Sequence, residues 1–200
     1  MAYLSLNNAM SRVVANFQAN PERFWNERDI HWSLFYCLKL GQVSEETYPT
    51  ELIRAEFPTL KVFDEARGHY DLVIINAESY NKPEVLNMNA QASWNDYLPL
   101  IELDVAIEIK LWLNRLQPEA MKEGVNWDIQ KLTDTPNKVK DAYLLNFVQL
   151  DFKRDIYEAY YQQLRDYLLE QKKQFPKLNI LCVPSVAQMQ NSTDNWLEYS

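Results

Sequence analysis

Hydrophobic and polar positions alternate most regularly between Leu103 and Trp112, in the run Leu-Asp-Val-Ala-Ile-Glu-Ile-Lys-Leu-Trp. Side chains of a strand point alternately to its two faces, so this period of two predicts a core strand. One face is entirely aliphatic, and the other carries Glu108 and Lys110 side by side. The apolar face comprises Leu103, Val105, Ile107, Ile109 and Leu111, and the second face comprises Asp104, Ala106, Glu108, Lys110 and Trp112.

Similar patterns predict further elements on both sides of this strand. Apolar residues with helical spacing predict helices at residues 2–20, from Pro21 to Gly41, at 127–132 and at 154–174. Apolar runs bounded by turn residues predict strands at 50–63, interrupted at Pro58, and at 68–76, 142–152 and 178–183. Residues 77–102 and 114–126 are polar and contain prolines. The first of these segments predicts an inserted loop, either a substrate-facing flap or a disordered hairpin end.

The composition indicates one domain, residues 1–200, with a substantial core. Hydrophobic residues make up 47% of the 200, and no repeat or low-complexity tract divides the chain. The first residues contain no basic side chain before Arg12 and no apolar signal-peptide core, and no apolar run is long enough to span a membrane. We therefore expect a cytoplasmic protein. Cys37 and Cys182 lie in apolar patterns, with no Cys-X-X-Cys motif and no Cys/His cluster, which favours buried free thiols over a zinc site.

The net charge of −8 argues against strong non-specific binding to nucleic acid, because that binding depends on Lys and Arg side chains that neutralise phosphates. The charge is uneven along the chain. Residues 1–109 carry 8 basic and 16 acidic side chains, whereas residues 110–177 carry 12 and 10. A weakly basic surface in the second half therefore remains compatible with the sequence, and the acidic first half is compatible with carboxylates gathered around divalent cations.

Each candidate site residue has a structural explanation as well as a functional one. Glu108 and Lys110 could form an ordinary ion pair on a solvated strand face, and Asp71 could be a turn or cap residue at the start of its strand. Glu27 and His31 lie four residues apart on one side of the second helix. The structural explanations there are a histidine hydrogen-bonded to Glu27, and a solvated Glu27 paired with Arg23 or His31.

Taken together, the order of elements and acids resembles the PD-(D/E)XK nuclease superfamily. The resemblance rests on Asp71 at the start of one strand and on Glu108-Ile109-Lys110 in the next strand. Further similar features are Glu27 on an N-terminal helix, the run Arg-Ala-Glu-Phe-Pro-Thr, Gly68 before the acid, and residues 128–132 (Asp-Ile-Gln-Lys-Leu) in the following helix. The resemblance covers residues 22–183. It departs from the family pattern at Tyr70, where the named motif has proline, and in the length of the 77–102 loop.

This resemblance implies an α/β fold with a restriction-endonuclease-like core, in which helices flank a mixed central β-sheet in the order αβββαβ plus an extra helix. It implies a Mg²⁺-dependent deoxyribonuclease, with Mn²⁺ as a substitute, acting in DNA restriction, repair or defence against mobile elements. Asp71 and Glu108 would bind the metal, and Lys110 would orient or help to deprotonate the attacking water. Glu27 would be a further catalytic residue.

The expected partner is DNA, and a homodimer is one option for the assembly. Phosphate contacts are expected from Lys131, Lys138 and Lys140 in the less acidic half of the chain. The alternative function is a non-catalytic DNA-binding or protein-interaction module on the same fold, which the negative net charge favours.

Overall fold

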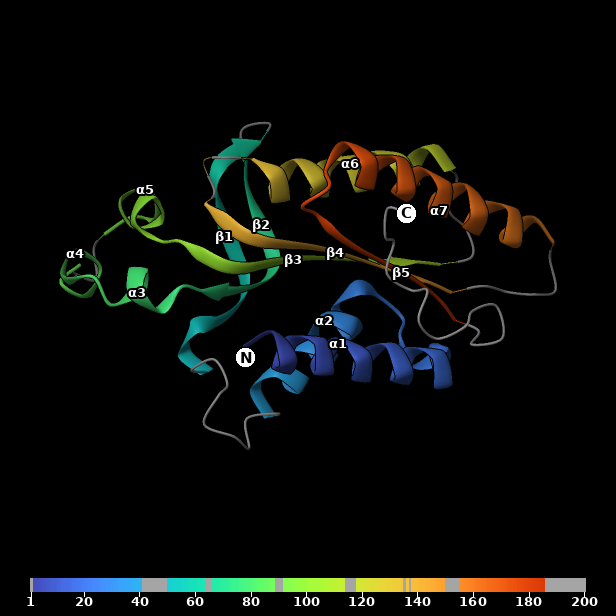
Figure 1. Ribbon diagram of the computed structural model, residues 1–200, viewed down its shortest axis with the longest axis horizontal. Coiled ribbons are helices and arrows are strands. Elements are labelled where there is room, and N and C mark those ends of the chain that lie inside the picture. Colours follow the sequence, from blue (N-terminus) through green and yellow to red (C-terminus); the bar gives the residue numbers. More distant parts are fainter. Residues whose placement is uncertain are drawn as a thin grey trace.

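The computed structural model describes residues 2–40, 50–63, 66–88, 92–113, 118–134, 136, 138–149 and 155–185. These residues form a five-stranded mixed sheet with helices on both faces (Figure 1). The predicted α/β class, with a mixed central sheet flanked by helices, is thereby confirmed. Within these ranges, no helix is both long and apolar enough to cross a membrane.

The strands lie side by side in the order in which they occur along the chain. They are β1 (Ile53–Phe63), β2 (Ala66–Ile75), β3 (Leu103–Trp112), β4 (Val139–Val148) and β5 (Asn179–Pro184). β1, β2 and β3 are antiparallel neighbours, whereas β3, β4 and β5 are parallel. Parallel neighbours require long crossover connections, which are supplied here by α6 (Pro118–Thr133) and α7 (Asp155–Gln174).

The helices form two layers, one on each face of the sheet (Figure 1). α1 (Ala2–Ala19), the short 3-10 helix η1 (Pro21–Arg23) and α2 (Glu27–Leu40) cover one face, and α6 and α7 cover the other. We call these the α1–α2 layer and the α6–α7 layer. In the first, the ring of Phe17 packs against Phe24 and Phe147, with centroid distances of 5.5 and 5.1 Å. α1 therefore belongs to the packed core, although the resemblance began only at residue 22.

The hairpin of β1 and β2 is bent at the level of Glu56 and Asp71, which lie opposite each other. Glu56 has a φ of 51°, in the left-handed region that residues other than glycine rarely adopt. On β2, Leu72 packs in the α1–α2 layer and Tyr70 in the α6–α7 layer, although residues two apart on a regular strand share a face. The bend turns β1 and β2 across the direction of the other strands (Figure 1).

The segment 77–102 differs from the predicted loop, because most of its described part is ordered into short helices. These are α3 (Ala77–Tyr80), α4 (Pro83–Leu86), α5 (Trp94–Tyr97) and the 3-10 helix η3 (Leu98–Leu100). Two prolines of the segment lie at helix starts, since Pro83 is the first residue of α4 and Pro99 lies in the first turn of η3. Asn76 caps α3 by accepting a 2.9 Å hydrogen bond from the Ser79 N–H.

Other differences concern the ends of elements. α6 is much longer than the predicted 127–132 segment and includes part of the polar stretch before it. β1 continues through Pro58, and its register shifts after this residue. A proline is tolerated here because β1 is at the edge of the sheet. The 3-10 turn η2 (Thr50–Leu52) precedes β1. Leu103 packs in the α6–α7 layer instead of with the other aliphatic residues of β3, next to a register irregularity at Ile75. Gly41 and residues 150–152 lie outside the described residues.

Replacing Phe17 by Ala tests the contribution of α1 to the core. The ring is completely buried between the helix and the sheet, so its loss leaves a cavity and should lower the free energy of unfolding by about 3–5 kcal/mol. Urea denaturation measures this change. Asn16→Ala, at an exposed position of the same helix, is the matched control and should stay within about 0.5 kcal/mol of wild type. Equal stability of the two variants would mean that α1 does not pack as described.

Candidate functional site

Glu108 and Lys110 point from β3 towards α6, where they meet Asp128 and Lys131. The Lys110 Nζ atom is 3.0 Å from Asp128 Oδ2, and the Lys131 Nζ atom is 2.7 Å from Glu108 Oε2 and 3.0 Å from Asp128 Oδ1. Asp128 therefore bridges the two lysines. Glu108 and Asp128 are almost completely buried, so these are interior ion pairs rather than the solvated pair that the sequence left open.

Two further carboxylates reach this cluster along the edge of β3. The described pairing of β2 with β3 ends at Leu72 and Ile107, because the hairpin bends away at Asp71. Asp71 Oδ2 accepts a 2.6 Å hydrogen bond from the Ile109 N–H, in the place where a strand partner would otherwise bind. The second carboxylate is Glu27. Burial raises its pKa, and a hydrogen bond from the backbone of Leu111, two residues after Ile109, partly offsets this effect.

Glu27 lies in the first turn of α2, on the face of the sheet opposite to α6. Its Oε1 atom is nevertheless 3.8 Å from Lys110 Nζ, because the edge of β3 is open at this level. The predicted site residues Glu27, Asp71, Glu108 and Lys110 are thus brought together from three separate elements. The structural explanation paired Glu27 with Arg23 or His31, whereas the structure places Lys110 beside it.

The cluster is short of positive charge. Four carboxylates (Glu27, Asp71, Glu108, Asp128) and two ammonium groups (Lys110, Lys131) give a formal charge of −2 when all are ionised. Burial raises the pKa of Glu27, Asp71 and Glu108, and in Glu108 the nearby Asp128 carboxylate raises it further. A divalent cation would remove this excess of negative charge.

The pKa values of the two lysines are also raised, but by the nearby carboxylates and against the effect of burial. Burial alone would lower the pKa of Lys110, but Asp128 and Glu27 more than compensate and raise it. The pKa of Lys131 is also raised, since Glu108 and Asp128 outweigh its burial. Both side chains are therefore charged at neutral pH. Lys110 can orient a water molecule or stabilise negative charge, but this environment does not make it a general base.

One feature of the carboxylates is compatible with a hard cation. Glu108 Oε1 is buried and has no hydrogen-bond partner among the described residues, which is costly for a carboxylate oxygen unless a ligand occupies the space beside it. The described residues contain no ready-made group of three or more His, Cys, Asp or Glu side chains that could hold a metal. Mg²⁺ requires only one or two protein carboxylates, so Asp71 and Glu108 are sufficient in number.

The three lysines predicted to contact phosphate lie in different places. Lys131 is part of the cluster, and its Nζ atom also donates to the His69 carbonyl at 3.2 Å. Lys138 and Lys140 are exposed, but Val139 between them is opposite Leu103, at the start of β3. At about 3.3 Å per residue, this places them roughly 13–20 Å before Glu108 along the strand. The structure therefore does not bring Lys138 and Lys140 to the site.

Asp128 entered the sequence analysis only as part of the 128–132 run, and no role in the site was predicted for it. Its position three residues before Lys131 on a helix was the available signal, since such residues share a helix face. His31 is buried, and its Nε2 atom has no hydrogen-bond partner among the described residues.

No family model matches this sequence, and neither the curated proteins nor the solved structures contain a match to it. The functional argument therefore depends on the residues and their geometry.

The raised pKa of Glu108 predicts how stability depends on pH without metal. The folded protein holds a proton on Glu108 at pH values where the unfolded chain has lost it, so stability should fall as pH rises above 4.5, the ordinary pKa of a glutamate side chain. Glu108→Gln should reduce this fall and be more stable than wild type at pH 8. Urea denaturation at pH 5 to 8 in a chelating buffer measures both effects.

Glu119→Gln is the control, because the Glu119 side chain is 84% exposed in the first turn of α6, outside the cluster. Its pH profile should match that of wild type. A Glu108→Gln profile as steep as that of wild type would contradict the assignment of the pH dependence to this carboxylate.

Proposed function

We propose that the chain is a metal-dependent deoxyribonuclease with a restriction-endonuclease-like core, of the PD-(D/E)XK type. The observation that carries this proposal is the convergence of Asp71, Glu108 and Lys110 with Glu27 at the open edge of β3. The predicted residues are distant in sequence, and an accidental Glu-X-Lys pattern would give no reason for them to meet. Further support comes from the excess negative charge and the unpartnered Glu108 Oε1 atom.

Hydrolysis of a phosphodiester requires stabilisation of charge on the phosphate and a nucleophilic water near neutral pH. Asp71 and Glu108 would hold Mg²⁺, with Mn²⁺ as a substitute, and the bound cation supplies both Lewis acidity and a more acidic water. The chain's own residues have separate tasks. Lys110 keeps its proton and places a positive charge beside the phosphate or the attacking water, and Glu27 accepts a hydrogen bond from that water.

Asp128 and Lys131 would position these groups. Asp128 fixes the ammonium group of Lys110 from the side of α6, and Lys131 neutralises one oxygen of Glu108. Lys131 would then contribute to the charge of the site more than to general phosphate binding. Two parts of the proposal rest on the resemblance alone. They are the specificity for DNA over RNA and the pathways, which are restriction, repair or mobile-element defence.

A second candidate is a non-catalytic DNA-binding or protein-interaction module. Three observations favour it: the net charge of −8, the ion pairs that occupy both lysines of the cluster, and exposed aromatic side chains on and before α2. Trp25, Trp32 and Tyr36 are 78%, 47% and 56% exposed. Exposed aromatic residues of this kind are common where proteins bind partners. This candidate predicts binding without cleavage.

Cleavage of supercoiled plasmid and of single-stranded DNA with Mg²⁺ or Mn²⁺ separates the two candidates. Lys110→Met should reduce the rate by about 10²–10³-fold, because it removes a charge placed where negative charge develops. Glu27→Gln should also reduce cleavage, and its thermal midpoint in metal-free buffer should be unchanged or higher.

Lys122→Met is the matched control for the lysine, since Lys122 is a partly exposed residue of α6 outside the cluster and pairs with Glu119. It should cut at the wild-type rate. Circular dichroism shows whether each variant is folded. Equal nicking by wild type and Lys110→Met would indicate a contaminating nuclease and would leave the binding module as the better proposal.

Metal binding has its own test, which does not depend on cleavage. Calorimetric titration should show Mn²⁺ binding that Asp71→Asn and Glu108→Gln each abolish, because Mn²⁺ has carboxylate preferences similar to those of Mg²⁺. Glu56→Gln is the control, since Glu56 lies opposite Asp71 on β1 but is exposed. If neither substitution in the site changes the titration, there is no metal site at Asp71 and Glu108.

A further inference from the structure

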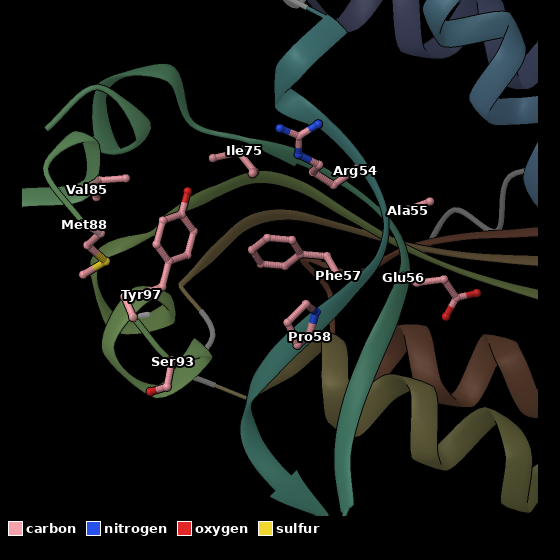
Figure 2. Close-up of a pocket in the computed structure, with 11 residues that line it drawn as sticks. Arg54, Ala55, Glu56, Phe57, Pro58, Ile75, Val85, Met88, Ser93 and Tyr97 are labelled. Carbon is pink, nitrogen blue, oxygen red and sulfur yellow. The ribbon is translucent and has the colours of Figure 1, made fainter. Parts of the chain in front are cut away.

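A cavity of about 660 Å³ lies between β1 and the short helices of the 77–100 segment (Figure 2). This volume is within the range of about 300–1,000 Å³ that is typical of ligand pockets. The cavity is separate from the carboxylate and lysine cluster, because none of the cluster residues lines it. Its walls are mainly apolar, with contributions from Phe57, Tyr97, Val85 and Met88.

The bend at Glu56 gives this cavity its aromatic wall. Ile53 and Phe57 are four residues apart and would share a face on a regular strand, but they pack in opposite layers. The left-handed backbone of Glu56 lies between them and turns the Phe57 ring towards Tyr97 (Figure 2). A strained backbone conformation costs free energy, and such conformations are concentrated at binding and catalytic sites.

The polar groups of the cavity are at its border. Arg54 lies at one end, close enough to affect the Tyr97 hydroxyl electrostatically, and has no ion-pair partner among the described residues. The Glu56 carboxylate points away from Phe57 and Tyr97 (Figure 2). The Ser93 hydroxyl is already used in a 2.7 Å hydrogen bond to Asp96. The available charge at this border is therefore positive.

We propose that the cavity binds a single nucleotide, with the base against the rings of Phe57 and Tyr97 and the phosphate at Arg54. Aromatic side chains bind any base through its flat face, and a guanidinium group matches the oxygens of a phosphate. A purely apolar ligand would leave Arg54 unused, and a cationic ligand would be repelled by it. A flat ring joined to an anionic group satisfies both parts of the cavity.

The nucleotide could be free or could belong to a DNA strand. The two sites share the bent hairpin, because Glu56 beside the cavity is opposite Asp71 in the cluster. If the chain is a nuclease, which rests on the proposed function, the cavity would hold an unstacked base near the scissile phosphate. Substrates with single-stranded or unpaired nucleotides would then be preferred, since removing a base from the stack is easiest there.

Fluorescence of 2-aminopurine tests the proposal in chelating buffer, where no cleavage occurs. The probes are 2-aminopurine deoxyribonucleoside monophosphate and a single-stranded oligonucleotide that contains one 2-aminopurine. Wild type should quench the probe as the base stacks. Tyr97→Leu keeps an apolar side chain but removes the ring, and Arg54→Gln removes the charge, so each should weaken binding by about tenfold.

Trp127→Leu is the control, because Trp127 is an exposed ring on α6 that could quench a base bound elsewhere. It should bind both probes as wild type does, and circular dichroism verifies that all variants are folded. Binding of the free nucleotide, of the oligonucleotide or of both supports the proposal if Tyr97→Leu and Arg54→Gln weaken it. The free nucleotide alone would indicate a small-molecule site and would exclude the unpaired DNA base.

The proposal is overturned if wild type binds neither probe at millimolar concentration. It is also overturned if the Tyr97 and Arg54 variants bind as wild type does. These outcomes do not depend on metal or on catalysis, so they are distinct from a failure of the nuclease proposal. A protein that cuts DNA but shows no such binding would keep its nuclease function and lose only the nucleotide pocket.

Discussion

The open edge of β3 is the constraint on which the arrangement of the candidate site depends. A central strand normally has its backbone groups bound by strands on both sides, but β2 pairs with β3 only from Leu72 onward, because the hairpin bends before that residue. The free backbone N–H groups of β3 must then find other acceptors, since buried donors without partners are costly. Asp71 accepts one such hydrogen bond directly. The same requirement that stabilises the strand thus holds a carboxylate in the cluster.

The interior charges have a cost that the rest of the fold must offset. Glu108 and Asp128 are buried, and removing the partners of an ion pair from water is costly. Apolar packing of the sheet between two helical layers provides the compensating stability, with Phe17, Phe147 and Tyr161 among its largest buried side chains. An unfavourable cluster kept within a well-packed core is typical of a functional site, where stability is given up for chemistry.

The sequence predicted the sheet and the candidate residues well where a local period was strong. β3 was identified in full, with Glu108 and Lys110 on one face, because alternation of side chains is a local property. The long-range features were not predictable in this way. The bend at Glu56 is a single backbone conformation, and the helices of residues 77–100 are too short to show a period; Asp128 acquires its role only because α6 crosses over Lys110. Lys138 and Lys140 have the right charge but lie at the wrong end of the strand, which composition alone cannot show.

Lys110 is contacted by Glu27 from one helical layer and by Asp128 from the other. The two partners of Lys110 are therefore synthesised at different times. Glu27 leaves the ribosome first, Lys110 follows, and Asp128 comes only when α6 has been synthesised. Because chains are made from the N-terminus and fold as units, a nascent chain that ends before α6 contains every residue of the Asp71, Glu108 and Lys110 set but lacks the carboxylate that fixes the lysine. The cluster is complete only when both layers are present on the sheet.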